Sequence, residues 1–196
     1  TSQVATGSIP YPVTVNPVSN KVFTGNYGTN TVTVIDGTSL AKVNVAVPAN
    51  PRIIAVNTAT NKAYVGSVGS ATVTVIDGNT YAATPVTVDQ VPLAIAVNPV
   101  TNRIYVLTSA AKVTVIDGAT LATSTVLTSN FPADIAVNPA TNKIYVANAN
   151  EVNVIDGVTN GVTNIAFGAL NGKVAVNPLT NRVYVTNANT NVLAVI

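Results

Sequence analysis

The sequence predicts an all-β repeat fold, and three observations lead to this expectation. A strand-like segment ending in Val-Asn recurs with its asparagine at residues 16, 57, 98, 138 and 177, so that the steps are 41, 41, 40 and 39 residues. The segments between turn residues are shorter than the roughly 10 residues that a helix requires. Val, Thr and Ile fill these segments, and Gly, Pro, Asn and Asp separate them. A repeat of about 40 residues built from short strands is typical of a β-propeller.

Each repeat is predicted to form one blade of four antiparallel strands. In the second repeat, the strands are expected at residues 52–56, 63–66, 72–77 and 86–89. The first strand of a repeat is apolar on both faces, so both of its faces must be covered. This is the position of the innermost strand of a propeller blade, and five repeats therefore predict a five-bladed β-propeller.

The predicted organisation is one propeller over residues 1–196, since a chain of this length ordinarily forms one domain. The last repeat contains only three of its four strands. Residues 1–8 are expected to supply the fourth strand of that blade and so to close the ring, which would protect its edge strands. The expected blades are residues 9–48, 49–89, 90–129, 130–167 and 168–196.

The turn after the first strand carries two asparagines in every repeat. Pro follows the first asparagine in four of the five copies and ends the strand, because it lacks an N–H group and restricts the residue before it. The second asparagine suits a left-handed backbone conformation. The predicted turn residues are Asn16 with Asn20, Asn57 with Asn61, Asn98 with Asn102, Asn138 with Asn142, and Asn177 with Asn181.

One cation and one carboxylate also recur in phase with the repeat. The cation begins the second strand and the carboxylate ends the third, so antiparallel pairing places them opposite each other. A charged ring that recognises an anionic partner is the functional alternative to structural ion pairs. The predicted pairs are Lys21–Asp36, Lys62–Asp77, Arg103–Asp117 and Lys143–Asp156.

The second strands carry a further motif, Tyr184-Val185-Thr186-Asn187, and the segment from Tyr145 to Asn148 differs from it at one position. Together with the AVNPxTNK and VxVIDG segments, it resembles the YVTN-repeat β-propeller family over nearly the whole chain. That family is found largely in exported and surface-layer-like proteins of bacteria and archaea. The resemblance implies an extracellular or cell-surface location. Family members more often have seven blades, which leaves open that this chain is part of a larger array.

Composition argues against catalysis. The chain has no His and no Cys, so the most common general base, metal ligand and thiol nucleophile are missing. The acids outside the repeat phase, Asp89, Asp134 and Glu151, belong to different blades. We therefore expect no enzyme activity and no cofactor. Because each Asp-Gly turn offers a single carboxylate, no metal site is predicted.

The charge and hydropathy of the chain limit the kinds of partner that it is expected to bind. The net charge of +2 comes from nine basic and seven acidic residues spread along the chain, which gives no groove for nucleic acid. No apolar run approaches the roughly 18 to 20 residues of a membrane span. The lack of Met suggests a processed chain, for instance one that has lost a secretory signal peptide.

These features favour a non-catalytic structural or interaction module, such as a surface coat, an adhesin or an appendage subunit, that binds proteins or copies of itself. Two alternatives remain. The chain could form filaments by exchanging its N-terminal strand or by lateral contacts, or, less favoured, it could bind a small ligand at the axial channel. The irregular loops between repeats would supply the ligand contacts. Their residues are Asp89, Gln90, Asn130, Phe131 and Asn171.

Some tyrosines recur at the repeat spacing, and others lie outside it. Those in phase on the second strands, Tyr64, Tyr105, Tyr145 and Tyr184, are expected to pack between blades. Those out of phase, Tyr11, Tyr27 and Tyr81, are expected to be exposed contact residues.

Overall fold

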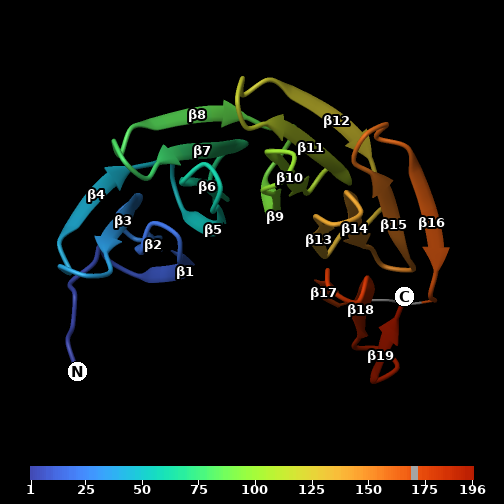
Figure 1. Ribbon diagram of the computed structural model, residues 1–196. Helices are drawn as coiled ribbons and strands as arrows, with labels where there is room; N and C mark the ends of the chain where they lie inside the picture. The colour runs from blue at the N-terminus through green and yellow to red at the C-terminus, as the bar shows by residue number, and fades with distance from the viewer. Residues whose placement is uncertain (169–171) are drawn as a thin grey trace. The chain divides into compact units, whose positions relative to one another are not determined.

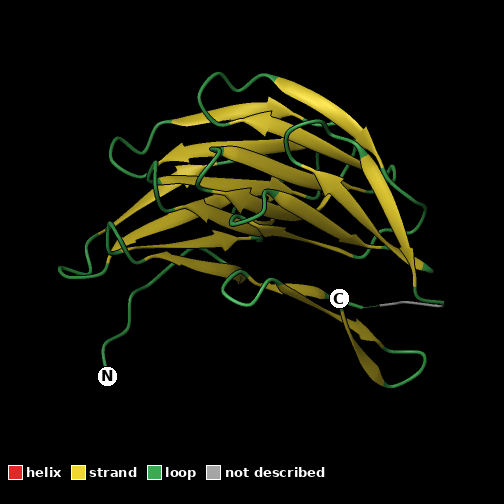
Figure 2. Ribbon diagram, turned by 45° about the vertical axis from the view of Figure 1, so that its right-hand side comes forward, coloured by secondary structure: helices red, strands yellow, loops and turns green. Residues whose placement is uncertain are grey.

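The computed structural model describes residues 1–168 and 172–196, which form strands joined by turns and contain no helix (Figure 2). No helix in the described residues could therefore cross a membrane. The chain forms two compact units, Thr1–Pro92 and Leu93–Ile196. The boundary falls at the start of a strand.

The first unit contains two four-stranded antiparallel sheets in which the strands follow one another in sequence order (Figure 1). The first sheet consists of β1 (Pro10–Asn16), β2 (Lys21–Asn26), β3 (Thr31–Asp36) and β4 (Lys42–Ala46). The second sheet consists of β5 (Pro51–Asn57), β6 (Lys62–Ser67), β7 (Thr72–Asp77) and β8 (Ala83–Thr87).

The second unit contains three sheets with the same order of strands. The third sheet consists of β9 (Pro92–Asn98), β10 (Arg103–Thr108), β11 (Lys112–Asp117) and β12 (Thr123–Leu127). The fourth consists of β13 (Asp134–Asn138), β14 (Lys143–Ala147), β15 (Glu151–Asp156) and β16 (Val162–Ala166). The fifth has three strands, β17 (Val174–Asn177), β18 (Arg182–Asn187) and β19 (Val192–Val195).

The first three strands of the second repeat were predicted to within one residue at each end, but the fourth was placed too late. It was expected at residues 86–89, whereas β8 covers Ala83–Thr87. The Asp77 N–H donates to the Ala82 carbonyl at 3.0 Å, which completes the Asp-Gly turn at that residue. The next residue is therefore already positioned to pair with β7.

The prediction that residues 1–8 form the fourth strand of the last blade was wrong. Residues 1–9 form no strand, and the fifth sheet has only three strands among the described residues. The N-terminal segment instead lies against the first sheet and its turns. Tyr27 N donates to the Ile9 carbonyl at 2.9 Å, Gly28 N donates to the Ser8 carbonyl at 3.0 Å, and Lys42 Nζ contacts the Ala5 carbonyl.

The core of the first unit lies between its two sheets. Phe23 and Val34 on the first sheet are buried in one cluster with Val65 and Ile76 on the second. Burial of an aliphatic or aromatic side chain of this size contributes about 1.5–3 kcal/mol.

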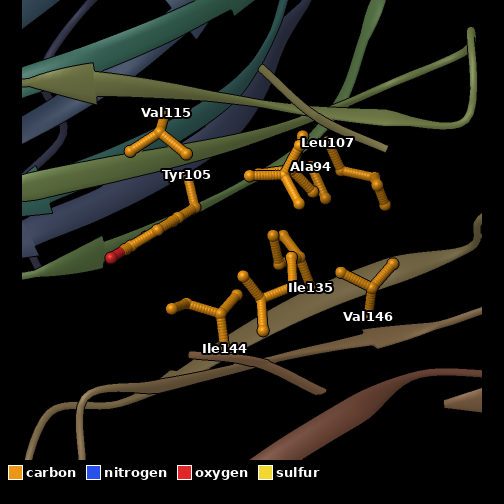
Figure 3. Packing of buried hydrophobic residues seen from close by; sticks show 10 residues of the cluster. Ala94, Tyr105, Leu107, Val115, Ile135, Ile144 and Val146 are labelled. Atoms are coloured by element: carbon orange, nitrogen blue, oxygen red, sulfur yellow. The ribbon is translucent and has the colours of Figure 1, made fainter. Parts of the chain in front are cut away.

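The second unit has two such cores, and β14 contributes to both. Ile144 and Val146 face the third sheet, where they pack with Ile135 of β13 against side chains that include Tyr105 (Figure 3). Tyr145 and Ala147 point the other way and pack against the fifth sheet. Because side chains alternate between the faces of a strand, a strand that is apolar at every position is covered on both sides.

The tyrosines that recur with the repeat are also buried where their strand is covered on both sides. Tyr64 and Tyr105 have no exposed surface, and Tyr145 is 6% exposed. Burial raises the pKa of the Tyr105 and Tyr145 hydroxyls. Tyr105 and Tyr145 pack between sheets of the second unit, as the sequence predicted, and Tyr184 is half-buried.

The two asparagines of each turn have different roles. The second has a left-handed backbone in every repeat, with φ between 51° and 53° at Asn20, Asn61, Asn102, Asn142 and Asn181. The first is buried in four of the five copies and accepts N–H groups of its own turn.

The first asparagine also reaches the next sheet. Asn16 Nδ2 donates to Asn61 Oδ1 at 2.8 Å, and Asn98 Nδ2 donates to Asn142 Oδ1 at 2.8 Å. The contact between Asn138 and Asn181 is 2.7 Å long. Side-chain amides thus join neighbouring sheets within each unit.

Candidate ligand-binding site

The four carboxylates in phase with the repeat are held by their own turns. Asp77 Oδ1 accepts the N–H groups of Thr80 at 2.9 Å and Asn79 at 2.8 Å. Asp36, Asp117 and Asp156 accept the equivalent groups at 2.8–3.0 Å. Each carboxylate closes an Asx turn, which ties the end of the third strand to the loop that follows.

These hydrogen bonds lower the pKa of each carboxyl below its usual value. The N–H group three residues after the aspartate has the largest effect in every case, as with Ser39 on Asp36 and Thr80 on Asp77. The cation across the strand pair adds the smallest lowering. The turn, rather than the ion pair, therefore holds the charge in place.

The predicted cation and carboxylate positions lie opposite each other across the strands. The register places Lys21 opposite Asp36, Lys62 opposite Asp77, Arg103 opposite Asp117 and Lys143 opposite Asp156. Lys21 Nζ lies 3.9 Å from Asp36 Oδ2. The Arg103 guanidinium, however, donates to the Gly157 carbonyl on the next sheet at 2.8 Å. Arg103 thus also bridges two sheets, a role that the sequence did not predict.

Asp134, an acid outside the repeat phase, also has a structural position. Its side chain is 19% exposed and accepts the N–H of Val174 at 3.2 Å. Lys173 Nζ lies 3.7 Å from its other oxygen. Asp134 therefore links the start of β13 to the fifth sheet.

An irregular loop produces a hollow of about 370 Å³ in the second unit. One wall is the β12–β13 loop, and the other is the β14–β15 turn. Phe131 stands in the first wall, is 80% exposed and has a φ of 56°. The lining residues are Ser129, Asn130, Phe131, Asn148, Ala149, Asn150 and Glu151.

The base of the hollow is polar. The Ser129 N–H donates to Asn153 Oδ1 at 2.8 Å, and its hydroxyl donates to Glu151 Oε1. Asn148 Nδ2 donates to Asn153 Oδ1 at 2.8 Å, and Asn148 Oδ1 is buried and has no hydrogen-bond partner. A buried unsatisfied acceptor costs about 1–3 kcal/mol, so this amide would gain from a donor brought by a ligand.

The hollow combines one exposed aromatic ring with amide and carboxylate acceptors. The aromatic ring can pack against the C–H groups on the face of a ligand. The acceptors can bind hydroxyl groups of the same ligand. No cluster of three or more acidic, His or Cys side chains occurs among the described residues. The residues of the hollow can recognise a ligand by stacking and hydrogen bonding.

Two of the predicted contact residues, Asn130 and Phe131, line the hollow together. Asp89 is half-buried and Gln90 is exposed, both in the β8–β9 loop, and neither lines this hollow. Asn171 lies outside the described residues.

Of the tyrosines expected to be exposed, two are. Tyr11 is 64% exposed, and its ring centroid lies 5.3 Å from the Arg52 guanidinium; Tyr27 is 37% exposed. Tyr81 is half-buried and packs against the core of the first unit, so the prediction was wrong for this residue.

Sequence reasoning also missed the opposite wall of the hollow, Asn148 to Glu151. One signal was present: Glu151 begins β15 at the position that Thr31, Thr72 and Lys112 hold in other sheets. A carboxylate there is irregular. Its closeness to Phe131, however, depends on the packing of two loops.

No family model and no curated protein matches the sequence. Among solved structures, hydrazine synthase of Kuenenia stuttgartiensis is similar, with a TM-score of 0.80 and 22% identity over 95% of this chain and 57% of that chain. The β-propeller domain of Cps50 (Swd1) from Myceliophteria thermophila gives a TM-score of 0.76 at 12% identity, over 95% of this chain and 64% of that chain.

Both likenesses concern the fold alone, and this chain spans about three fifths of the length of either structure. Together with the sheets described above, they establish that the chain has a β-propeller fold.

Proposed function

We propose that this chain is a non-catalytic interaction module displayed outside the cell, and that the Phe131 hollow binds a sugar ring on a neighbouring surface, as an adhesin does. The observation that carries the proposal is the pairing of an 80% exposed aromatic side chain with a polar hollow. An exposed aromatic ring in water is stabilised when a ligand covers it.

The other carboxylates have structural partners, and this supports a binding role for the Phe131 hollow. The repeat-phase carboxylates are engaged by turn N–H groups, and Asp134 links two sheets. Such groups serve folding. The chain also lacks His and Cys. Glu151 is the carboxylate that lines the hollow, and a single carboxylate does not make the acid–base pair of a glycosidase.

The chemistry of the hollow suits a sugar better than an apolar ligand. Asn148, Asn150 and Glu151 offer acceptors for hydroxyl groups on the side opposite Phe131. The volume of about 370 Å³ lies near the lower end of ligand sites, which commonly measure about 300–1,000 Å³. One or two sugar rings are the expected occupants.

A glycan array probed with the purified chain tests this proposal. We expect binding to a defined set of glycans that Phe131→Ala and Glu151→Gln each abolish. Leu179→Ala is the matched control, since Leu179 is a 95% exposed apolar residue in a different loop of the same unit. Equal binding by wild type and Phe131→Ala, or no binding at all, would reject the sugar site. Turnover of a bound glycan would reject the non-catalytic role.

Self-assembly by strand exchange at β19 is a second candidate function. Among the described residues, β19 pairs with β18 and has no strand on its other side. Residues 3–6 form no strand of their own, and in this candidate function they leave the first sheet and add to β19 of another copy. A cysteine pair placed in this segment and in β19 would be oxidised and analysed by mass. Cross-linked multimers support exchange between copies, and cross-linked monomers or no cross-link reject it.

A further inference from the structure

Tyr81 fills a position between the two sheets of the first unit. It lies in the Asp-Gly turn after β7 and reaches the first sheet, where its hydroxyl accepts a hydrogen bond from Lys21 Nζ at 3.2 Å. The Lys21 ammonium lies 5.4 Å from the centre of the tyrosine ring. The ring also packs against the core cluster that contains Val34. One aromatic ring thus covers a cation and an apolar wall.

Asn160 holds the same place in the turn after β15. Both residues lie four positions after the turn aspartate, Asp77 or Asp156, and their φ angles agree, 62° at Tyr81 and 61° at Asn160. Arg103 is the equivalent of Lys21, since both begin the second strand of the preceding sheet. The two inter-sheet positions therefore share one backbone geometry and differ in the side chain that fills them.

The shorter asparagine leaves a hollow of about 170 Å³ where the tyrosine ring would lie. Val115 and Arg103 line it in the places of Val34 and Lys21. Asn160 Oδ1 is buried there and has no hydrogen-bond partner. Arg103 Nη1 donates to the Gly157 carbonyl at 2.8 Å, which fixes the guanidinium at the hollow.

We propose that this hollow binds the side chain of a tyrosine presented by a protein partner, at a site separate from the Phe131 hollow. The ring would stack on the Arg103 guanidinium and on Val115, as Tyr81 does on Lys21 and its cluster. Guanidinium groups stack on aromatic faces at least as well as ammonium groups do. The phenol hydroxyl would donate to Asn160 Oδ1 and give that buried acceptor its missing partner.

Titration with N-acetyl-tyrosinamide, followed by NMR, tests the site. We expect saturable shifts of the Arg103 side-chain N–H and the Asn160 amide signals. Arg103→Ala is expected to weaken binding about tenfold, because it removes the stacked cation. N-acetyl-leucinamide is the matched probe without a ring. Shifts of equal size with the leucine probe, or no shift with the tyrosine probe, would overturn the proposal.

Asn160→Tyr gives an independent readout. The substituted ring should fill the hollow as Tyr81 fills its own position, so the melting temperature should rise and the tyrosine probe should no longer bind. Ala140→Tyr, on an exposed turn of the same sheet, controls for the addition of a tyrosine. Probe binding to Asn160→Tyr at the wild-type strength would contradict the assignment, whether or not the melting temperature changes.

Discussion

The Asn16 side chain donates to Asn61 Oδ1 at 2.8 Å, although the two residues are 45 positions apart in the sequence. Asn16 is completely buried, and its own Oδ1 accepts the Val18 N–H at 3.0 Å. One amide therefore closes a turn in its own sheet and holds the next sheet. Asn98 and Asn138 repeat this arrangement.

Replacing Asn16 with Ala should destabilise the first unit by about 1–3 kcal/mol, since the turn N–H and Asn61 Oδ1 both lose a partner. Asn16→Asp keeps the turn acceptor but places a carboxylate oxygen against Asn61 Oδ1 at a completely buried position, where an unpaired charge is costly. Urea unfolding is expected to rank the stabilities as wild type, then Ala, then Asp. An Ala variant as stable as wild type would show that the amide contact contributes nothing.

Gly78 should not tolerate a side chain. A Cβ at this position would lie 2.6 Å from Asn61 Oδ1 and 2.7 Å from the Asn61 carbonyl oxygen, and the backbone oxygen cannot move away alone. Gly78→Ala should therefore cost about 1–3 kcal/mol through overpacking. Gly161→Ala is the control, because its nearest contact would be Thr159 Oγ1 at 3.2 Å. Equal losses of stability at the two glycines would refute the steric explanation.

Acid should unfold the chain through the four turn aspartates. Turn N–H groups lower the pKa of Asp36, Asp77, Asp117 and Asp156 in the folded state. A lowered folded pKa contributes stability that is present above the unfolded value of about 3.9 and is lost as the pH falls through the folded pKa. Melting temperatures should therefore be level near neutral pH and fall below about pH 4.

Replacing all four aspartates with Asn provides the matched control for this acid effect. The Asn side chain accepts the same turn N–H groups but does not titrate. The melting temperature of the fourfold variant should therefore depend less on pH in the acid range than that of wild type. An unchanged acid transition in the variant would assign the pH dependence to other groups.

The periodic part of this fold could be predicted, because each repeat carries its own turn chemistry. The Pro and Asn residues of the turns fix where strands end, and the registers that pair Lys21 with Asp36 and Lys62 with Asp77 follow from the turn length. The start of β8 was missed because the Asp-Gly turn is closed by a backbone bond to Ala82, which leaves no sequence signal.

Contacts between sheets were harder to predict, because the partners lie about one repeat apart. The contact of Asn16 with Asn61 and the hydrogen bond from Arg103 to Gly157 both depend on the packing of one sheet on the next. The same holds for the hollow. Phe131 was identified as a contact residue, but Glu151 comes from another loop and joins it only in the folded chain.

Asp134 offers a test of which of its two partners matters. Lys173 Nζ is 3.7 Å away, but the lysine side chain is 75% exposed, and such ion pairs contribute about 0–1 kcal/mol. The N–H of Val174, a buried residue, donates to Asp134 at 3.2 Å, and an unsatisfied buried donor costs about 1–3 kcal/mol. Asp134→Ala should therefore destabilise the second unit by about 1–3 kcal/mol, whereas Lys173→Ala should change its stability little. Asp134→Asn keeps an acceptor for Val174 without the charge and should lie close to wild type in urea unfolding. Equal losses in the Lys173→Ala and Asp134→Ala variants would show that the ion pair, and not the backbone hydrogen bond, joins the fourth and fifth sheets.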